Sequence, residues 1–217
     1  MPVAPSAPVL QAQSLCFAYP GQLPLFTCLS FNLPAGITLL EGDTGTGKTT
    51  LLRLLAADLR AGSGSLRLGG HSLADDAAVY RRGVCWFDPR DSAWDALTPA
   101  GLMAAQRNTR PGLDAAAWQR HLAGFDLAPH LAMPLYALST GSRRKAGLAV
   151  ALAAGAALTL LDEPTVGLDA ASLAYLAQAL DEAATAPRHA LLLASCHGLD
   201  ALPMAGVLTL PGAAASA

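Results

Sequence analysis

GDTGTGKT, residues 42–49, is the most restrictive pattern in this sequence. It has the form G-x-x-x-x-G-K-[ST] of a phosphate-binding loop, and its members are Gly42, Asp43, Thr44, Gly45, Thr46, Gly47, Lys48 and Thr49. An apolar run at 36–41 precedes the loop and predicts a short buried strand, and residues 50–56 follow it and predict a buried helix. This order of strand, loop and helix is the setting in which the pattern binds a nucleoside triphosphate.

The residue types of the loop explain this chemistry. Glycines let the backbone bend around an anion, and the start of the following helix adds free N–H donors and a partial positive charge. Lys48 is expected to reach the terminal phosphates of the nucleotide, the Thr49 hydroxyl to hold Mg²⁺, and Thr50 to complete the nucleotide-binding set. A glycine turn that merely caps a helix is the alternative, and the Lys-Thr pair disfavours it.

The composition fits one domain. The chain has 217 residues, of which 14% are charged and 53% apolar. The longest weakly polar run, 146–161, is shorter than the roughly 20 residues that a membrane-spanning helix needs, so no span is expected. The formal net charge of −2 provides no basic footprint for nucleic acid, so no nucleic-acid partner is expected.

The N-terminus and the cysteines carry weaker signals. Residues 1–8 contain three prolines without a basic or apolar segment, which predicts a flexible tail and no signal peptide. The cysteines are Cys16, Cys28, Cys85 and Cys196, and they lack C-x-x-C spacing. They are expected to be small core residues in a reducing cytoplasm.

Strand-like and helix-like segments alternate along the rest of the sequence. This alternation predicts an α/β fold, a P-loop NTPase with a mainly parallel sheet and an N-terminal antiparallel β part. Strands are expected at 9–18, 25–33, 62–70, 84–87, 158–161, 190–195 and 207–210, and helices at 142–153 and 170–184. Helical stretches near 99–107 and 114–124 predict a helical subdomain, approximately 89–145, inserted in a single domain at 9–212.

Two carboxylates end the apolar strand at 158–161. Such a strand is expected beside the phosphate-loop strand, with its carboxyl end at the ligand crevice. Asp162 is then placed to hold Mg²⁺, and Glu163 to polarise the attacking water as a general base. A strand followed by an acidic helix cap is the alternative, and the Lys48-Thr49 pair upstream favours the catalytic interpretation.

From about residue 10 to 210 the ordered motifs resemble those of the ATP-binding subunits of ABC transporters. Tyr19 matches the aromatic residue that stacks on adenine, and LSTGSRRK at 138–145 is similar to the L-S-G-G-Q signature that opens a helix. DEPTVGLD at 162–169 matches the Walker B segment and the D-loop, which ends in Asp169, and His197 matches the switch histidine.

The resemblance implies an ATPase that works as a nucleotide-sandwich dimer. Ser139 and Gly141 of one subunit would contact the γ-phosphate held by the other, which is a second copy or a homologous ATPase subunit. His197 would hold that phosphate during hydrolysis. ATP and Mg²⁺ are the implied cofactors, and an integral membrane transporter subunit is the implied partner. The chain would lie in the cytoplasm, peripheral to the inner face of the cell membrane.

Two positions depart from the family pattern. Thr140 replaces the first signature glycine, which is expected to tune the site. Asp88 stands where the family has a glutamine that touches the Mg²⁺ and the membrane partner; it is either a metal ligand or a turn residue before Pro89.

The short length resembles that of exporter subunits. The alternatives are a haem-exporter-like subunit of cytochrome c maturation, a non-transport ABC-type ATPase, and a regulatory nucleotide switch with weak turnover.

Overall fold

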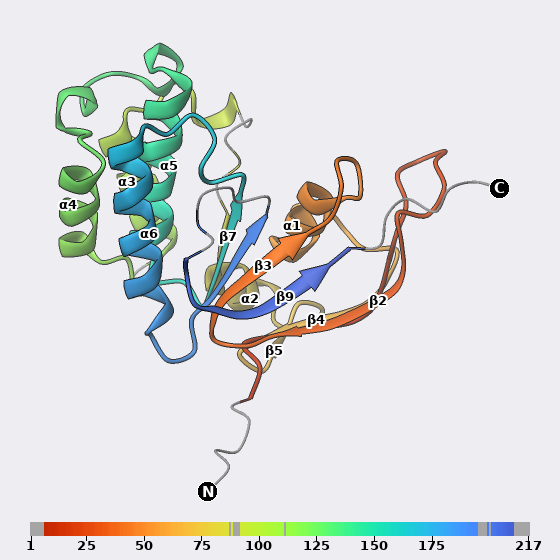
Figure 1. The fold of residues 1–217 in the computed structure, drawn as a ribbon. Helices are drawn as coiled ribbons and strands as arrows, with labels where there is room; N and C mark the ends of the chain where they lie inside the picture. Colours follow the sequence, from red (N-terminus) through yellow and green to blue (C-terminus); the bar gives the residue numbers. More distant parts are fainter. Residues whose placement is uncertain are drawn as a thin grey trace, which may run out of the picture.

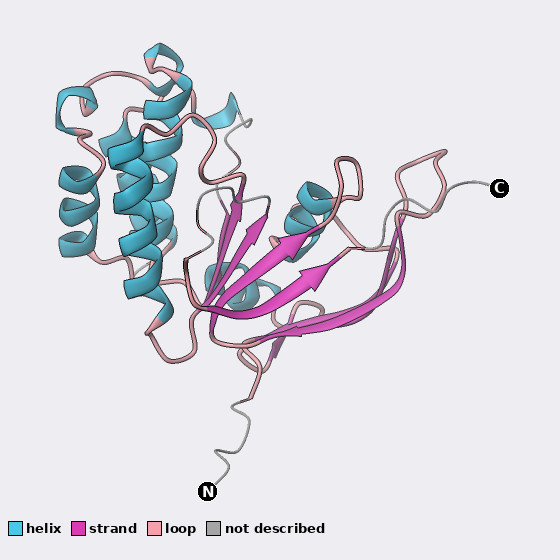
Figure 2. Ribbon diagram, viewed as in Figure 1, coloured by secondary structure: helices cyan, strands magenta, loops and turns pink. Residues whose placement is uncertain are grey.

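The computed structural model describes residues 7–86, 88, 92–110, 112–194, 199 and 201–210. Two sheets and two groups of helices make up these residues (Figures 1 and 2). The larger sheet is parallel and has the order β6-β7-β8-β3-β9. Its strands are β3 (Gly36–Glu41), β6 (Val84–Trp86), β7 (Leu158–Asp162), β8 (Ala190–Ala194) and β9 (Met204–Thr209).

This strand order corrects one prediction. The strand that ends in Asp162 does not lie beside the phosphate-loop strand, because β8 separates β7 from β3. β8 is buried along its whole length and pairs with both neighbours in parallel, so its apolar run takes the central place. The carboxyl ends of β7 and β3 still lie at the same edge of the sheet.

The smaller sheet is antiparallel and has the order β2-β1-β4-β5. Its strands are β1 (Leu10–Phe17), β2 (Phe26–Leu33), β4 (Ser63–Leu68) and β5 (His71–Ser72). β1 and β2 lie where the sequence predicts strands, at 9–18 and 25–33. β5 and the helix α2 (Ala77–Gly83) are not predicted from the sequence, since both are too short to show a clear period.

The longer helices are α1 (Lys48–Leu55), α3 (Pro99–Thr109), α4 (Ala115–Gly124), α5 (Thr140–Ala153) and α6 (Ala170–Ala184), and single 3₁₀ turns lie at 92–94, 128–130 and 135–137. Figure 1 shows α3, α4, α5 and α6 gathered on one side of the parallel sheet, with α1 on the other. No strand is present among the described residues of 92–145, and this stretch is the candidate helical subdomain.

Alternating side chains divide the core between the two faces of the parallel sheet. Leu191 and Leu193 of β8 pack with α3 to α6, whereas Leu192 and Ala194 pack with α1 and the antiparallel sheet. All four side chains are fully buried. β8 therefore packs against the helical group with one face and against the phosphate-loop helix α1 with the other, and so fixes their relative positions.

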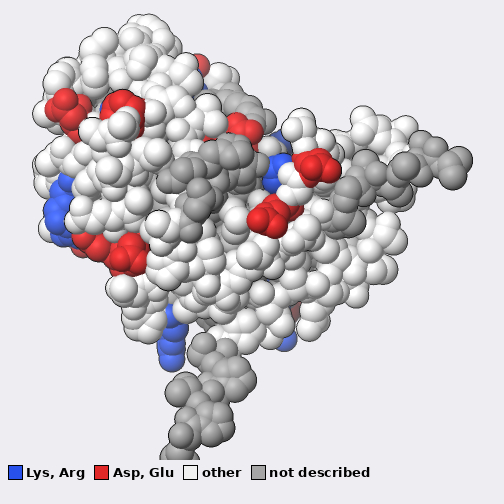
Figure 3. Space-filling view, viewed as in Figure 1, with Lys and Arg blue, Asp and Glu red and all other residues white. Residues whose placement is uncertain are grey.

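The surface is sparsely charged. Figure 3 shows uncharged side chains over most of one face, with small acidic and basic groups scattered across it. Among the described residues, no helix is both long and apolar enough to span a bilayer.

His121 gives the helical group a pH-dependent stability. Its side chain is 7% exposed, and its Nδ1 lies 2.9 Å from the Tyr175 hydroxyl, which itself donates to the Arg120 carbonyl. Burial, helped by the charge of Arg120, lowers the pKa of His121 to about 4. The imidazole is therefore neutral in the folded protein at pH 7 and cannot easily take a proton there.

We expect the free energy of unfolding to fall as the pH drops from about 6.5 to about 4. In that window the unfolded chain binds a proton at His121 that the folded chain does not bind, and the loss amounts to at most roughly 3 kcal/mol. Urea unfolding at pH 7 and pH 4.5 measures it, with His121→Gln as the comparison. An equal loss of stability in the two proteins would contradict a buried neutral histidine.

Candidate functional site

The phosphate loop joins β3 to α1. Gly47 is the N-cap of α1 and has a φ of 97°, which a residue with a side chain rarely adopts. A Cβ at this position would lie 2.8 Å from Leu25 Cδ2 and 2.9 Å from Phe26 Cζ. Gly47 therefore provides both the left-handed turn and the close approach of the loop to the start of β2.

Hydrogen bonds between residues of the phosphate loop fix its conformation. The Thr46 hydroxyl, whose side chain is buried, donates to the Asp43 carbonyl at 2.9 Å. Lys48 Nζ donates to the Gly42 carbonyl at 2.5 Å and to the Asp43 carbonyl at 3.0 Å. Residues 43–45 are exposed. The ammonium group is thus held inside the loop, at the N-terminus of α1, where an anion would be stabilised.

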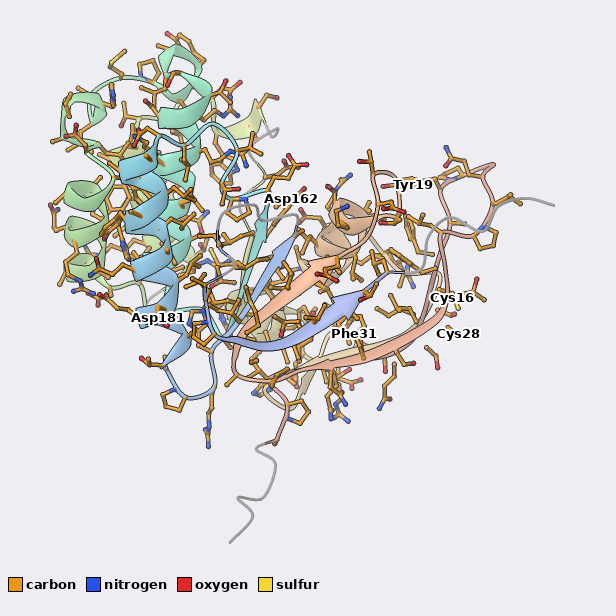
Figure 4. The ribbon with its side chains drawn as sticks, viewed as in Figure 1. Cys16, Tyr19, Cys28, Phe31, Asp162 and Asp181 are labelled. Atoms are coloured by element: carbon orange, nitrogen blue, oxygen red, sulfur yellow. The ribbon has the colours of Figure 1, made fainter. Side chains whose placement is uncertain are left out.

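Thr49 and Asp162 meet across the sheet edge. The Thr49 hydroxyl donates to Asp162 Oδ2 at 2.6 Å, although the two residues are 113 positions apart in the sequence. Asp162 is 7% exposed and lies at the end of β7 (Figure 4). A buried carboxylate next to a hydroxyl offers two hard oxygen ligands, so these two residues fit a Mg²⁺ ion.

Tyr19 lies over the start of α1. Its hydroxyl is 3.0 Å from Thr50 Oγ1, and its ring meets Phe17 edge to face with centroids 4.9 Å apart. The side chain is half-buried, and Figure 4 shows Tyr19, which belongs to the β1–β2 turn, near α1. The structure thus brings the predicted aromatic residue to the phosphate-loop helix and fixes its ring from two sides.

Glu163 follows β7 directly and is held in an unusual backbone conformation. Its φ is 47°, in the left-handed region that non-glycine residues adopt at a cost of about 1–3 kcal/mol. Its N–H donates to the Ala194 carbonyl at 2.9 Å. Arg144 Nη1 donates to the Glu163 carbonyl, and to the Asp162 carbonyl at 3.1 Å. These contacts fix the backbone that carries the half-buried Glu163 side chain.

The signature segment opens α5. Ser139 is the N-cap, and its hydroxyl accepts from the Ser142 N–H at 3.1 Å. Ser139 and Thr140 are exposed. A Cβ at Gly141 would lie 2.4 Å from the Gly167 carbonyl, so the start of α5 packs against the backbone of the 163–169 loop. This contact leaves no room for a side chain at position 141, and the exposed N-terminus of α5 remains open to an anion.

The next three residues, Arg143, Arg144 and Lys145, have structural roles that are not predicted from the sequence. Arg143 Nη1 pairs with Asp95 Oδ1 at 2.5 Å. Lys145 Nζ pairs with Asp169 Oδ2 at 2.6 Å. Together with Arg144 they tie α5 to three different segments around the site. These three residues lie within the first two turns of α5 after Ser139, and this position could have indicated that they contact segments around the site.

Asp169 has a second function at the start of α6. Its Oδ1 accepts from the Ser172 N–H at 2.8 Å and caps the helix. The Lys145 contact, and then the hydrogen bonds to Ser172, hold the pKa of the Asp169 carboxyl well below its usual range. Asp169 is therefore ionised throughout the neutral range and joins α5 to α6 across the 163–169 loop.

Some predicted residues fall outside the described part of the chain. They are His197, Cys196 and residues 1–6 of the expected tail. Asp88 is half-buried, and the residues on both sides of it, 87 and 89–91, lie outside the described part of the chain. The expectation that the cysteines are core residues is correct for Cys85, which is 3% exposed, and wrong for Cys28, which is exposed, and for the half-buried Cys16. Both lie on the small sheet, where the chain has only one covered face.

Comparison with known proteins identifies the family of this chain. The model of the ABC transporter family matches residues 26–166, which is more than half of the chain. The cytochrome c biogenesis ATP-binding export protein CcmA of Rhodospirillum rubrum is 37% identical over 95% of this chain and 88% of its own length. The cobalt import ATP-binding protein CbiO of Rhodobacter capsulatus is 34% identical over 78% of this chain and 63% of its own length.

A solved ATP-binding subunit of an ABC transporter has the same fold, with a TM-score of 0.76 and 23% identity over 86% of this chain and 79% of that one. ATP-binding subunits of this kind form dimers and act with membrane partners in a transporter. The chain belongs to the ABC transporter family and is an ATP-binding subunit that hydrolyses ATP to drive transport.

Proposed function

We propose that this chain powers an exporter of the cytochrome c biogenesis type, as one of two ATPase subunits that clamp two ATP molecules on the inner face of a membrane. The observation that carries the nucleotide part is the Thr49–Asp162 contact of 2.6 Å beside Lys48, because it joins the phosphate loop to the acidic strand end. The similarity to CcmA along 95% of the chain supports the direction and type of transport.

Each group around the phosphates has a separate task in this proposal. Lys48 and the loop N–H groups hold the β- and γ-phosphates, and Tyr19 packs on the adenine ring. Thr49 and Asp162 would hold Mg²⁺, with Asp88 as a further oxygen ligand, and the ion would neutralise negative charge on the phosphates. The hydroxyl–carboxylate pair is already formed, so the protein supplies these ligands without rearranging its backbone.

Glu163 is the proposed general base. Glu163 directly follows Asp162, which contacts Thr49 of the phosphate-loop helix, and its carboxylate is proposed to orient a water molecule there. His197 is proposed to hold the γ-phosphate in line with that water. Phosphoryl transfer depends on positioning and charge stabilisation, which is why the fixed backbone at Glu163 matters.

The second subunit completes each site. Ser139, Gly141 and the N-terminus of α5 are proposed to face the γ-phosphate bound by the other copy, and Asp169 to lie at the same interface. Thr140 is exposed at this helix start, so it can occupy the position of the family glycine without disturbing its own subunit. ATP then favours the dimer because it makes contacts there that a single chain lacks.

Arg144→Ala tests whether this guanidinium positions Glu163. We expect kcat to fall about 10- to 100-fold while KM for ATP stays nearly constant, because the phosphate loop is untouched and only the backbone at Asp162 and Glu163 loosens. Steady-state phosphate release measures both values. Arg107→Ala, at an exposed position of α3, is the control. A change in KM without a change in kcat would contradict a positioning role. A fall in kcat that is fully explained by a lower thermal midpoint of the variant would contradict it as well.

The direction of transport is tested in a strain that lacks its own cytochrome c biogenesis export ATPase. Expression of this chain with its genomic neighbour membrane protein is expected to restore covalently bound haem in c-type cytochromes, and the Glu163→Gln variant is expected to fail. Normal ATPase activity without restoration would reject the export proposal. Cobalt uptake by the same complex would instead indicate an importer, in line with the similarity to the cobalt import protein CbiO.

A further inference from the structure

Two cysteines lie side by side on the antiparallel sheet, away from the phosphate loop. Cys16 of β1 and Cys28 of β2 have their Sγ atoms 3.8 Å apart (Figure 4). The strand register shifts between Leu15 and Phe17, so this pair sits at an irregular point of the ladder. Cys28 is exposed and has a φ of 53°, and Cys16 is half-buried.

The surroundings favour the thiolate form of Cys16. The Cys28 N–H donates to Cys16 Sγ at 3.2 Å. Hydrogen bonding from the Ser63 side chain, and then from the Cys28 N–H, lowers the pKa of Cys16, whereas the neighbouring Cys16 raises the pKa of Cys28. The two thiols therefore differ. Cys16 is the better nucleophile near neutral pH, and Cys28 loses its proton only at a higher pH.

We propose that Cys16 and Cys28 form a thiol-modification site at which a small disulfide such as oxidised glutathione produces a reversible cross-strand disulfide. A disulfide has a sulfur–sulfur length of about 2.05 Å, so the two Sγ atoms must approach by less than about 2 Å. β1 and β2 are paired antiparallel neighbours, and the Cα spacing of paired strands lies in the range that disulfides span. By contrast, the buried Cys85 has no such access to an oxidant.

The reaction balances in two exchange steps. Cys16 thiolate attacks one sulfur of oxidised glutathione, forms a mixed disulfide and releases one glutathione thiolate. Cys28 then loses its proton, and its sulfur attacks Cys16 Sγ, which forms the Cys16–Cys28 bond and releases the second glutathione. Two protein thiols are oxidised to one disulfide, and one glutathione disulfide is reduced to two thiols.

The new bond would close a ring around the β1–β2 turn. This ring contains Tyr19, which contacts Thr50, and Leu25 and Phe26, which pack against Gly47 of the phosphate loop. Cross-linking restricts the unfolded chain, so we expect the oxidised protein to unfold at a temperature about 5 °C higher than the reduced protein.

The test is oxidation of the full chain with oxidised glutathione, followed by alkylation and peptide mass mapping. Wild-type protein is expected to lose two hydrogen atoms, carry no glutathione and yield a linked Cys16–Cys28 peptide, while Cys85 stays reduced in the folded protein. Cys28→Ser should stop at the mixed disulfide on Cys16, since the resolving thiol is missing. Cys16→Ser should form at most a mixed disulfide on Cys28 and no cross-strand disulfide, because the partner thiol is missing.

Three outcomes would overturn the proposal. They are wild-type protein that retains glutathione, both thiols still open to alkylation after prolonged oxidation, and a linkage that joins Cys16 or Cys28 to any other cysteine or to a second chain. An unchanged thermal midpoint in fully cross-linked protein would overturn the expected stabilisation of the β1–β2 turn.

Discussion

Glu163→Gln is expected to lower kcat for ATP hydrolysis by about 10²- to 10⁴-fold and to leave ATP affinity within about twofold. The amide keeps the size and shape of the carboxylate but cannot accept a proton from water. Contacts to the triphosphate come from Lys48 and the loop, which the change does not touch. Single-turnover phosphate release and fluorescent-ATP titration measure the two effects separately.

Glu41→Gln is the matched control for this experiment. Glu41 is an exposed glutamate at the end of β3, beside the phosphate loop, and the substitution makes the same chemical change. Its kcat is expected to stay close to that of the wild type. If Glu163→Gln retains wild-type turnover, another group must activate the water.

Lys48→Ala is expected to weaken ATP binding by about 100-fold or more. Hydrogen bonds between charged groups contribute about 1.5–3 kcal/mol each, and this ammonium is held where the two terminal phosphates would lie. Its contacts with the Gly42 and Asp43 carbonyls show that the side chain already points into the loop. Isothermal titration with a non-hydrolysable ATP analogue measures the loss.

Arg53→Ala, in the last turn of α1, serves as the control for Lys48→Ala because it removes a positive charge from the same helix, far from its N-terminus. It should bind the analogue as the wild type does. Unchanged affinity in Lys48→Ala would mean that the loop is not the triphosphate site.

Local patterns in the sequence predicted the elements around the site, whereas the order of the strands needed the tertiary fold. The loop at 42–49 specifies its own turn and helix start, and the motif places Asp162 opposite Thr49 although 113 positions separate them. Strand neighbours depend on which buried run takes the centre of the sheet. β7 and β8 are both short, apolar and fully buried, so composition alone does not show that β8 lies next to β3.

Side-chain partners at the edge of the site were the least predictable part. Three consecutive basic residues have the appearance of a solvated surface patch. On a helix, however, successive residues point about 100° apart, so Arg143, Arg144 and Lys145 reach three different segments. The proximity of Cys16 and Cys28 was equally hidden, since it depends on a register shift between β1 and β2.

The shared nucleotide site between two copies is tested most directly by the molar mass of the Glu163→Gln protein with Mg²⁺ and ATP. The chain has a mass of 22.2 kDa, and light scattering should show twice this value with ATP and the single mass without it. Adding Thr140→Glu places a carboxylate on the exposed start of α5, where it favours the helix but repels a phosphate on a facing subunit.

The double variant should therefore bind ATP with the affinity of an isolated chain and remain at 22.2 kDa, while Thr140→Ser in the same background should still dimerise. A Glu163→Gln protein that binds ATP fully and stays monomeric, or a Thr140→Glu double variant that dimerises as readily as its parent, would contradict a site completed by the second subunit.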